Sequence, residues 1–122
     1  MPAECEVDPV RRLVKVRVWG VFTPANVMET RAKFTSDPAF SPVFFQLFDI
    51  SEVTVVDMTA QEVRAAAVDE VFSENSRRAL VAPRDDVFGL SRMFAIFREI
   101  HGGRERIEVF RTLEEAEAWL AG

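Results

Sequence analysis

The sequence predicts an α/β protein with one domain over residues 1–122. The length is enough for one hydrophobic core, and the proportions of 48% apolar and 29% charged residues are those of an ordinary globular protein. Strand-like and helix-like segments alternate along the chain, and strand-helix-strand crossovers require a largely parallel sheet. The predicted order is β-β-α-β-α-β-α-β-α. This gives a mixed, mostly parallel five-stranded sheet with an N-terminal antiparallel hairpin and four helices.

The first two strands are predicted as a hairpin. CEVD (5–8) alternates briefly, DPVRR (8–12) supplies a proline-containing turn, and LVKVRVWG (13–20) alternates between apolar and cationic side chains. The valines of this second strand are expected to pack on the core. The face with Lys15 and Arg17 is expected to be solvated, because long cationic side chains keep their charged ends in water. Gly20 is expected to end the strand.

The next two segments predict a helix and a central strand. Residues 23–37 begin with Thr23 as an N-cap and Pro24 at the first helical position, and the prolines that follow stop the helix. Its inner side is expected to carry Val27, Met28, Arg31 and Phe34. VFFQLFDI (43–50) is a nearly continuous apolar run, which is typical of a strand buried on both faces.

The remaining segments complete the alternation. A second helix is predicted over 59–72, a strand over 77–82, a third helix over 85–103, a last strand over 106–110 and a closing helix over 112–122. The third helix is amphipathic, and only Phe88 lies off its apolar stripe. The stripe consists of Val87, Leu90, Met93, Phe94, Ile96, Phe97 and Ile100. Thr112 and Glu115 form a capping box for the closing helix.

Composition excludes several classes of function. The net charge of −5 provides no basic surface for nucleic acid. Cys5 has no partner for an internal disulfide, and with His101 it cannot make an ordinary zinc site, so no metal and no cofactor is predicted. No signal peptide and no membrane span is predicted, and a cytoplasmic location is expected. His101 is expected to be a helix C-terminal residue that suits the dipole.

The segment FDISEVTVVDMTAQEV (48–63) holds the candidate site. Thr59 and Glu62 form a predicted capping box, which leaves the threonine hydroxyl exposed at a helix start, where the dipole favours an added phosphate. A second interpretation takes Asp49 and Asp57 as a carboxylate pair for acid-base chemistry or magnesium, because α/β folds place chemistry at the carboxyl ends of strands. No glycine-rich phosphate loop and no nucleophile with a nearby base accompanies that pair.

Within this segment, DIS (Asp49 to Ser51) and DMTA (Asp57 to Ala60) stand where STAS domains carry D-L-S and D-S-S-G. The chain therefore resembles the STAS domain, the SpoIIAA-like family of bacterial anti-sigma factor antagonists. Further segments are similar to small bacterial STAS/SEC14-type proteins of unknown role: DPAF, FSENSRRALVAP, FGLSRMF and VFRTLEEAEAWL. The resemblance implies the SpoIIAA-like fold. It also implies Thr59 as a phospho-acceptor for a partner-switching serine kinase, with an anti-sigma factor as a further candidate partner. Met58 and Ala60 stand in place of the first serine and the glycine.

The leading functional hypothesis is a non-enzymatic regulatory module that binds a protein partner around the start of the second helix. The candidate partner-binding residues are Asp49, Ser51, Asp57, Met58, Ala60, Glu62 and Phe88. If Phe88 joins Val87 and Met58 in one exposed patch, that patch would suit a partner or a second copy of the chain in a homodimer. The alternative is a carrier of a small hydrophobic ligand or lipid, suggested by the SEC14-like element order and the phenylalanine-rich third helix. An enzyme that uses Asp49 and Asp57 ranks third.

Overall fold

The computed structural model describes residues 2–122 and contains one mixed five-stranded sheet. The strands lie in the order β1-β2-β3-β4-β5, with β1 antiparallel to β2 and the other neighbours parallel. Their bounds are β1 Ala3–Asp8, β2 Leu13–Phe22, β3 Phe45–Val56, β4 Arg77–Val81 and β5 Arg106–Phe110. The predicted fold class and element order are confirmed.

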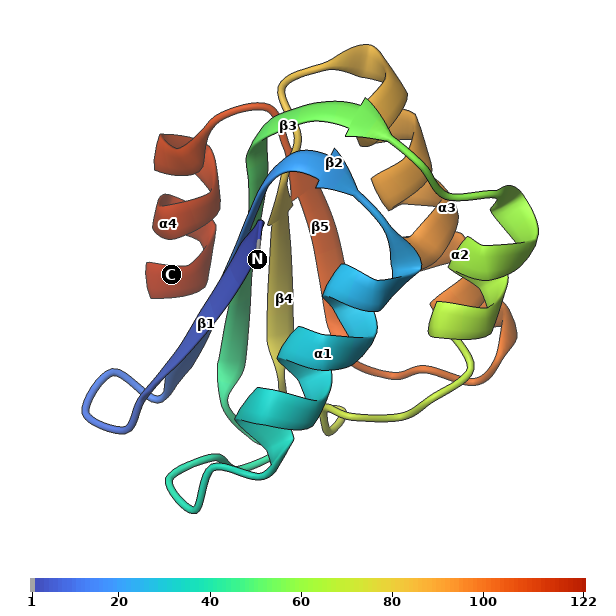
Figure 1. The fold of residues 1–122 in the computed structure, drawn as a ribbon. Coiled ribbons are helices and arrows are strands. Elements are labelled where there is room, and N and C mark those ends of the chain that lie inside the picture. Colours follow the sequence, from blue (N-terminus) through green and yellow to red (C-terminus); the bar gives the residue numbers. More distant parts are fainter. Residues whose placement is uncertain (1) are drawn as a thin grey trace.

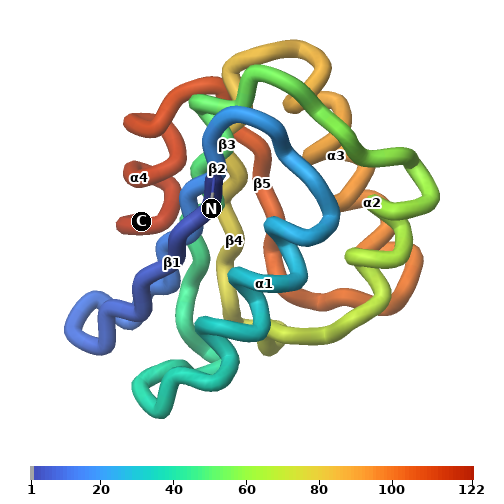
Figure 2. Tube along the Cα trace, viewed as in Figure 1, coloured from blue at the N-terminus to red at the C-terminus, as the bar shows by residue number. Residues whose placement is uncertain are grey.

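Helices cover both faces of the sheet, three on one side and one on the other (Figure 1). The first three are α1 (Pro24–Thr35), α2 (Ala60–Ala66) and α3 (Asp85–Ile100), and α4 (Leu113–Ala121) lies alone on the opposite face. The Cα trace in Figure 2 shows the same arrangement. Val14, Val16 and Val18 face the three-helix side and are fully buried, as predicted for the valine face. No helix within residues 2–122 is long and apolar enough to cross a membrane.

Gly20 does not end β2, contrary to the sequence prediction. It has a φ of +67°, and the pairing register with β3 shifts on either side of it. A glycine in the left-handed region lets a strand bulge and then continue. The strand therefore runs on to Phe22, which is buried in the core.

The central strand is also longer than predicted. β3 does not stop near residue 50 but continues to Val56, because the extended end of β2 gives it a partner as far as the Phe22–Val56 pair. The β-branched residues of TVV suit this continuation. Asp49 and Ser51, which were expected at the end of the strand, therefore lie inside it.

The second helix is shorter than the predicted 59–72. α2 ends at Ala66 because guanidinium groups take the carbonyl oxygens that a longer helix would use. Arg31 Nη2 donates to Ala66 O at 3.0 Å, and Arg98 Nη1 donates to Ala67 O at 2.9 Å. These arginines come from the other two helices on this face, so the sequence of α2 does not reveal its end.

The inner faces of α1 and α3 differ from the predicted stripes. Met28 in α1 is 55% exposed, and Ile96 and Ile100 in α3 are 52% and 63% exposed. The fully packed positions of α3 are Val87, Ser91 and Arg98. α3 is rotated so that Arg98 reaches the buried Glu105, and this turns Ile96 and Ile100 outward.

Candidate functional site

The predicted phospho-acceptor segment lies where β3 passes into α2. Thr59 is exposed and caps the helix: its Oγ1 accepts from the backbone N–H of Glu62 at 3.1 Å. In return, Glu62 Oε1 accepts from the Thr59 backbone N–H at 3.0 Å and from its hydroxyl at 3.1 Å. The predicted capping box is confirmed. The hydroxyl faces solvent, but it is engaged by a carboxylate.

The residues next to Thr59 divide between solvent and core. Asp57 and Ala60 are exposed, and the backbone N–H of Asp57 donates to Phe22 O at 2.9 Å, which fixes the loop to the end of β2. Met58 is half-buried and packs against the main hydrophobic core. The loop thus exposes two carboxylates, those of Asp57 and Glu62, around one hydroxyl.

Asp49 and Ser51 lie away from this loop. Asp49 is the strand partner of Arg17, and its Oδ1 accepts from the Ser51 backbone N–H at 2.9 Å. It borders the same surface as Leu113 and Glu117 of α4. At a rise of about 3.3 Å per residue, Asp49 is roughly 20 Å along β3 from its end at Val56. The Asp49–Asp57 pair expected for acid-base chemistry or magnesium is therefore not assembled.

Phe88 does not form an exposed patch with Val87 and Met58. Val87 is 1% exposed, and the Arg111 guanidinium lies 3.9 Å from the centroid of the half-buried Phe88 ring. Arg111 is held there by a 2.6 Å ion pair with Asp85. A cation over the aromatic face satisfies both groups. The expected hydrophobic docking face at the helix starts is therefore absent from this surface.

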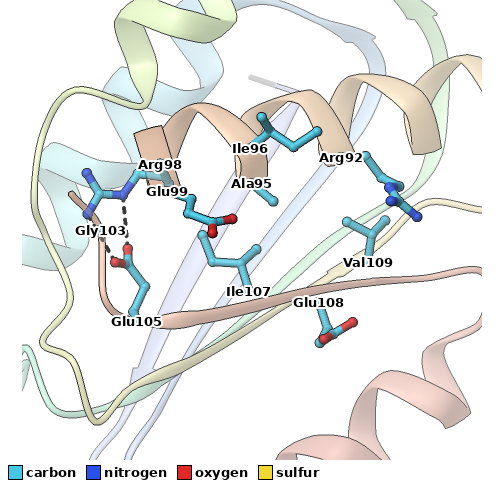
Figure 3. Close-up of a pocket in the computed structure, with 10 residues that line it drawn as sticks. All are labelled: Arg92, Ala95, Ile96, Arg98, Glu99, Gly103, Glu105, Ile107, Glu108 and Val109. Atoms are coloured by element: carbon cyan, nitrogen blue, oxygen red, sulfur yellow. Dashed lines mark hydrogen bonds and ion pairs between the residues drawn. The ribbon is translucent and has the colours of Figure 1, made fainter. Parts of the chain in front are cut away.

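A buried charge cluster, which we call the arginine cluster, lies beneath α3. It consists of Arg78, Arg98, Glu105 and Gln46. Arg98 binds Glu105 in a bidentate pair at 3.1 and 3.0 Å (Figure 3). Arg78 donates to the same carboxylate at 2.9 Å and to Gln46 Oε1 at 2.9 Å. The Arg78 guanidinium also lies over the rings of Phe72 and Phe94, at 4.8 and 5.2 Å from their centroids.

Two guanidiniums share one carboxylate in this cluster. Glu105 is the only buried carboxylate within residues 2–122, and the side chains of Arg78, Arg98 and Glu105 are 6%, 3% and 0% exposed. Burial lowers the pKa of Arg78 to about 10, although the charge of Glu105 opposes this. Burial alone would raise the pKa of Glu105, but the hydrogen bond from Arg98 and the charge of Arg78 outweigh it and hold that pKa below its ordinary value.

A small cavity adjoins the arginine cluster between the sheet and the first three helices. Its volume is ≈ 50 Å³, and most of its lining is apolar, including Phe22, Phe48 and Leu90. Met58, from the candidate loop, is part of its wall. Four polar side chains also line it: Arg31, Gln46, Arg78 and Ser91. Ser91 is 1% exposed, and its hydroxyl has no hydrogen-bond partner in the described part of the chain.

A second hollow, a groove of ≈ 470 Å³, lies between α3 and β5 (Figure 3). Charged side chains line much of it, among them Arg92, Glu99 and Glu108, with Ile96 and Ile107 between them. No group of three or more histidine, cysteine, aspartate or glutamate side chains that could hold a metal ion occurs in residues 2–122.

Comparison with solved structures identifies a chain of the same architecture. It is an uncharacterized protein of the DUF3478 family from Shewanella loihica PV-4, described as having a SpoIIAA-like fold. The TM-score is 0.64 at 14% sequence identity, over 97% of this chain and 93% of that chain. The chain has a SpoIIAA-like (STAS) fold. No family model matches the sequence, and no protein with a curated description is significantly similar to it.

The two motifs that suggested the SpoIIAA-like fold lie apart in the structure. DMTA forms the β3–α2 junction, whereas DIS lies in the middle of β3, where Asp49 borders α4 and Ile50 is buried on the three-helix side. The arginine cluster and the cavity were not predicted. The one signal for them was polar residues at positions whose neighbours are apolar: Gln46 within an apolar strand, and Ser91 and Arg98 on the inner side of an amphipathic helix.

Proposed function

We propose that this protein is a non-enzymatic binding module that recognises a protein partner through the loop and helix start at residues 57–62. The single observation that carries this proposal is the exposed Thr59 hydroxyl, flanked by the carboxylates of Asp57 and Glu62 at the β3–α2 junction. This is also the position to which the STAS resemblance assigns the phospho-acceptor. Glu62 and Ala60 are exposed beside it and are available to a partner.

Phosphorylation of Thr59 would act as the switch. A serine/threonine kinase that transfers the γ-phosphoryl group of ATP to Thr59 Oγ1 forms the O–P bond and releases ADP. The hydroxyl proton, which Thr59 donates to Glu62 in the unmodified protein, passes to the kinase's catalytic base. Phosphorylation also adds about 1.5 to 2 negative charges beside the Glu62 carboxylate. The repulsion breaks the capping box of a seven-residue helix, which has little stability of its own. A partner that fits the capped, less acidic form would then be released.

The experiment is a pull-down with three variants that test whether the effect of an added charge is specific to Thr59. Thr59→Glu adds a charge at the proposed switch, whereas Thr112→Glu makes the same change at the N-cap of α4, on the other face of the sheet. Thr59→Ser keeps the cap. We expect the wild type, Thr112→Glu and Thr59→Ser to retain the same partner and Thr59→Glu to lose it. Intact-mass measurement of the protein from its own cells tests whether Thr59 carries a phosphate.

Identical partners for Thr59→Glu and Thr112→Glu would remove the switch from the proposal. The absence of any partner that depends on residues 57–62 would remove the binding function as well.

A second proposed function, the carrier of a small hydrophobic ligand, is supported by a different observation. An apolar cavity lies between the sheet and the first three helices, and Met58 of the candidate loop is part of its wall. Its volume of ≈ 50 Å³ is far below the several hundred Å³ of a pocket for a large ligand, so the ligand must be small.

A further inference from the structure

The polar groups that line the cavity determine which small ligand it suits. Ser91 sits on the packed face of α3, 1% exposed, with a hydroxyl that no group within residues 2–122 satisfies. Serine in a helix ordinarily bonds back to the preceding turn when no other partner is present. Buried polar groups are ordinarily hydrogen-bonded, so this unpaired hydroxyl is free to donate to an acceptor in the cavity.

Positive charge exceeds negative charge around the same cavity. Arg78 and Arg98 share the one buried carboxylate, Glu105, which leaves one uncompensated cation in the interior. The recorded hydrogen bonds of Arg78 use Nε and Nη1, so its Nη2 has no partner among the described residues. Arg31 adds a third guanidinium, 13% exposed, whose ion pair is with the exposed Asp69. An anionic group in the cavity would balance this charge, because buried charges persist when they are paired.

Apart from these groups and Gln46, the wall is apolar. Phe22, Phe48, Leu80 and Leu90 surround the space, and the flexible side chain of Met58 lies at the candidate loop. Met adapts its shape to what it packs against. A ligand that fits must therefore have one anionic end and a short aliphatic body.

We infer that this cavity binds a short aliphatic monocarboxylate, whose carboxylate accepts hydrogen bonds from Ser91 and Arg78 and whose chain lies against the apolar wall up to Met58. A carboxylate offers two oxygens in one plane, which suits a guanidinium nitrogen and a hydroxyl at the same time. This inference rests on the second proposed function, the small-ligand carrier, and names its ligand class. It is independent of partner binding at residues 57–62.

The test compares acetate with ethanol, a neutral probe of the same chain length, by isothermal titration calorimetry on the whole protein. We expect acetate to bind at least tenfold more tightly than the alcohol. The ¹³C-methyl signal of Met58 should shift on binding, and this locates the ligand in the cavity. Equal affinity of the two probes would overturn the carboxylate assignment and leave the carrier function standing. Binding of neither probe would overturn both.

Ser91→Ala supplies the matched variant. It removes a hydroxyl that bonds to nothing in the unliganded protein, so the fold should be kept. Acetate affinity should fall about tenfold, while ethanol affinity stays within about twofold. Ser91→Leu, which fills the cavity, should abolish binding of both probes. Unchanged acetate affinity in Ser91→Ala would overturn the inference.

Discussion

At the scale of single residues, Glu105 has a role that its side-chain type alone does not suggest. It is an acid that lies immediately before a short strand, a place where glutamate is ordinarily solvated. Here it is fully buried and holds two arginines from different elements, Arg78 of β4 and Arg98 of α3. A buried pair contributes little net stability compared with apolar residues, but removal of one partner leaves an unpaired buried charge. Glu105 is therefore more critical to folding than either arginine.

Glu105→Gln should lower the free energy of unfolding by about 3–5 kcal/mol, because two buried guanidiniums then lack a counter-charge. Glu108→Gln, at an exposed position of β5, is the matched control and should change it by less than about 0.5 kcal/mol. Urea unfolding of both variants checks this. Equal small effects would show that the arginine cluster is not what stabilises this layer.

At the scale of elements, replacing each of two glycines at α3 by alanine is expected to change stability in opposite directions. Gly89 is exposed inside the helix with open space around a Cβ, so Gly89→Ala should stabilise the protein by about 0.5–1 kcal/mol. Gly103 follows the helix, and a Cβ there would lie 2.6 Å from Arg98 Nη2 and 2.8 Å from Arg98 O. Gly103→Ala should destabilise by about 1–3 kcal/mol, since it displaces Arg98 from Glu105. Thermal unfolding of the pair measures both, and a stabilising Gly103→Ala would contradict the packing of Arg98.

The ends of the helices show what local sequence determines. The capping box of Thr59 with Glu62 was predicted correctly, and Thr112 caps α4 as predicted by accepting from the Glu115 N–H, although Glu115 does not bond back to the Thr112 backbone; a cap depends on residues three apart. The end of α2 was not predicted. It depends on Arg31 and Arg98, which lie about thirty residues away on either side. The starts of α2 and α4 therefore depend on local sequence, whereas the end of α2 depends on tertiary contacts.

At the scale of the whole molecule, stability should depend on pH through the arginine cluster. The pKa of Glu105 is lower in the folded state than in the unfolded chain, so the unfolded state binds a proton first as pH falls. The stabilisation is complete at neutral pH. It is lost from about pH 4.3, the ordinary value for glutamate, as pH falls through the lower folded value. Wild type should thus lose more unfolding free energy between pH 6 and 3 than Glu105→Gln does, as measured by urea titrations at each pH. Parallel curves for the two proteins would contradict this.

The sheet was predictable because its signals are short-range. Apolar runs, turn residues and strand-helix alternation gave every strand and the parallel arrangement. The candidate loop was predicted for the same reason, since Asp57 to Glu62 are contiguous. The interior polar site was not, because Arg78 and Glu105 each look like an ordinary polar residue until the fold brings them beside Ser91. The predicted Asp49–Asp57 pair was wrong for the opposite reason. The two residues are close in sequence, but the extended strand β3 holds them apart.

The sequential strand order has a consequence for synthesis on the ribosome. Each strand lies beside the one made just before it, so the sheet can grow in step with translation. The charges of the arginine cluster are not paired in the same progressive order. Arg78 and Arg98 emerge before Glu105, and until it arrives a nascent chain has two cations with no acid to receive them. The sheet can therefore assemble progressively, but the layer beneath α3 can pack only after Glu105 has been synthesised. Nascent chains halted before residue 105 should therefore remain sensitive to proteases.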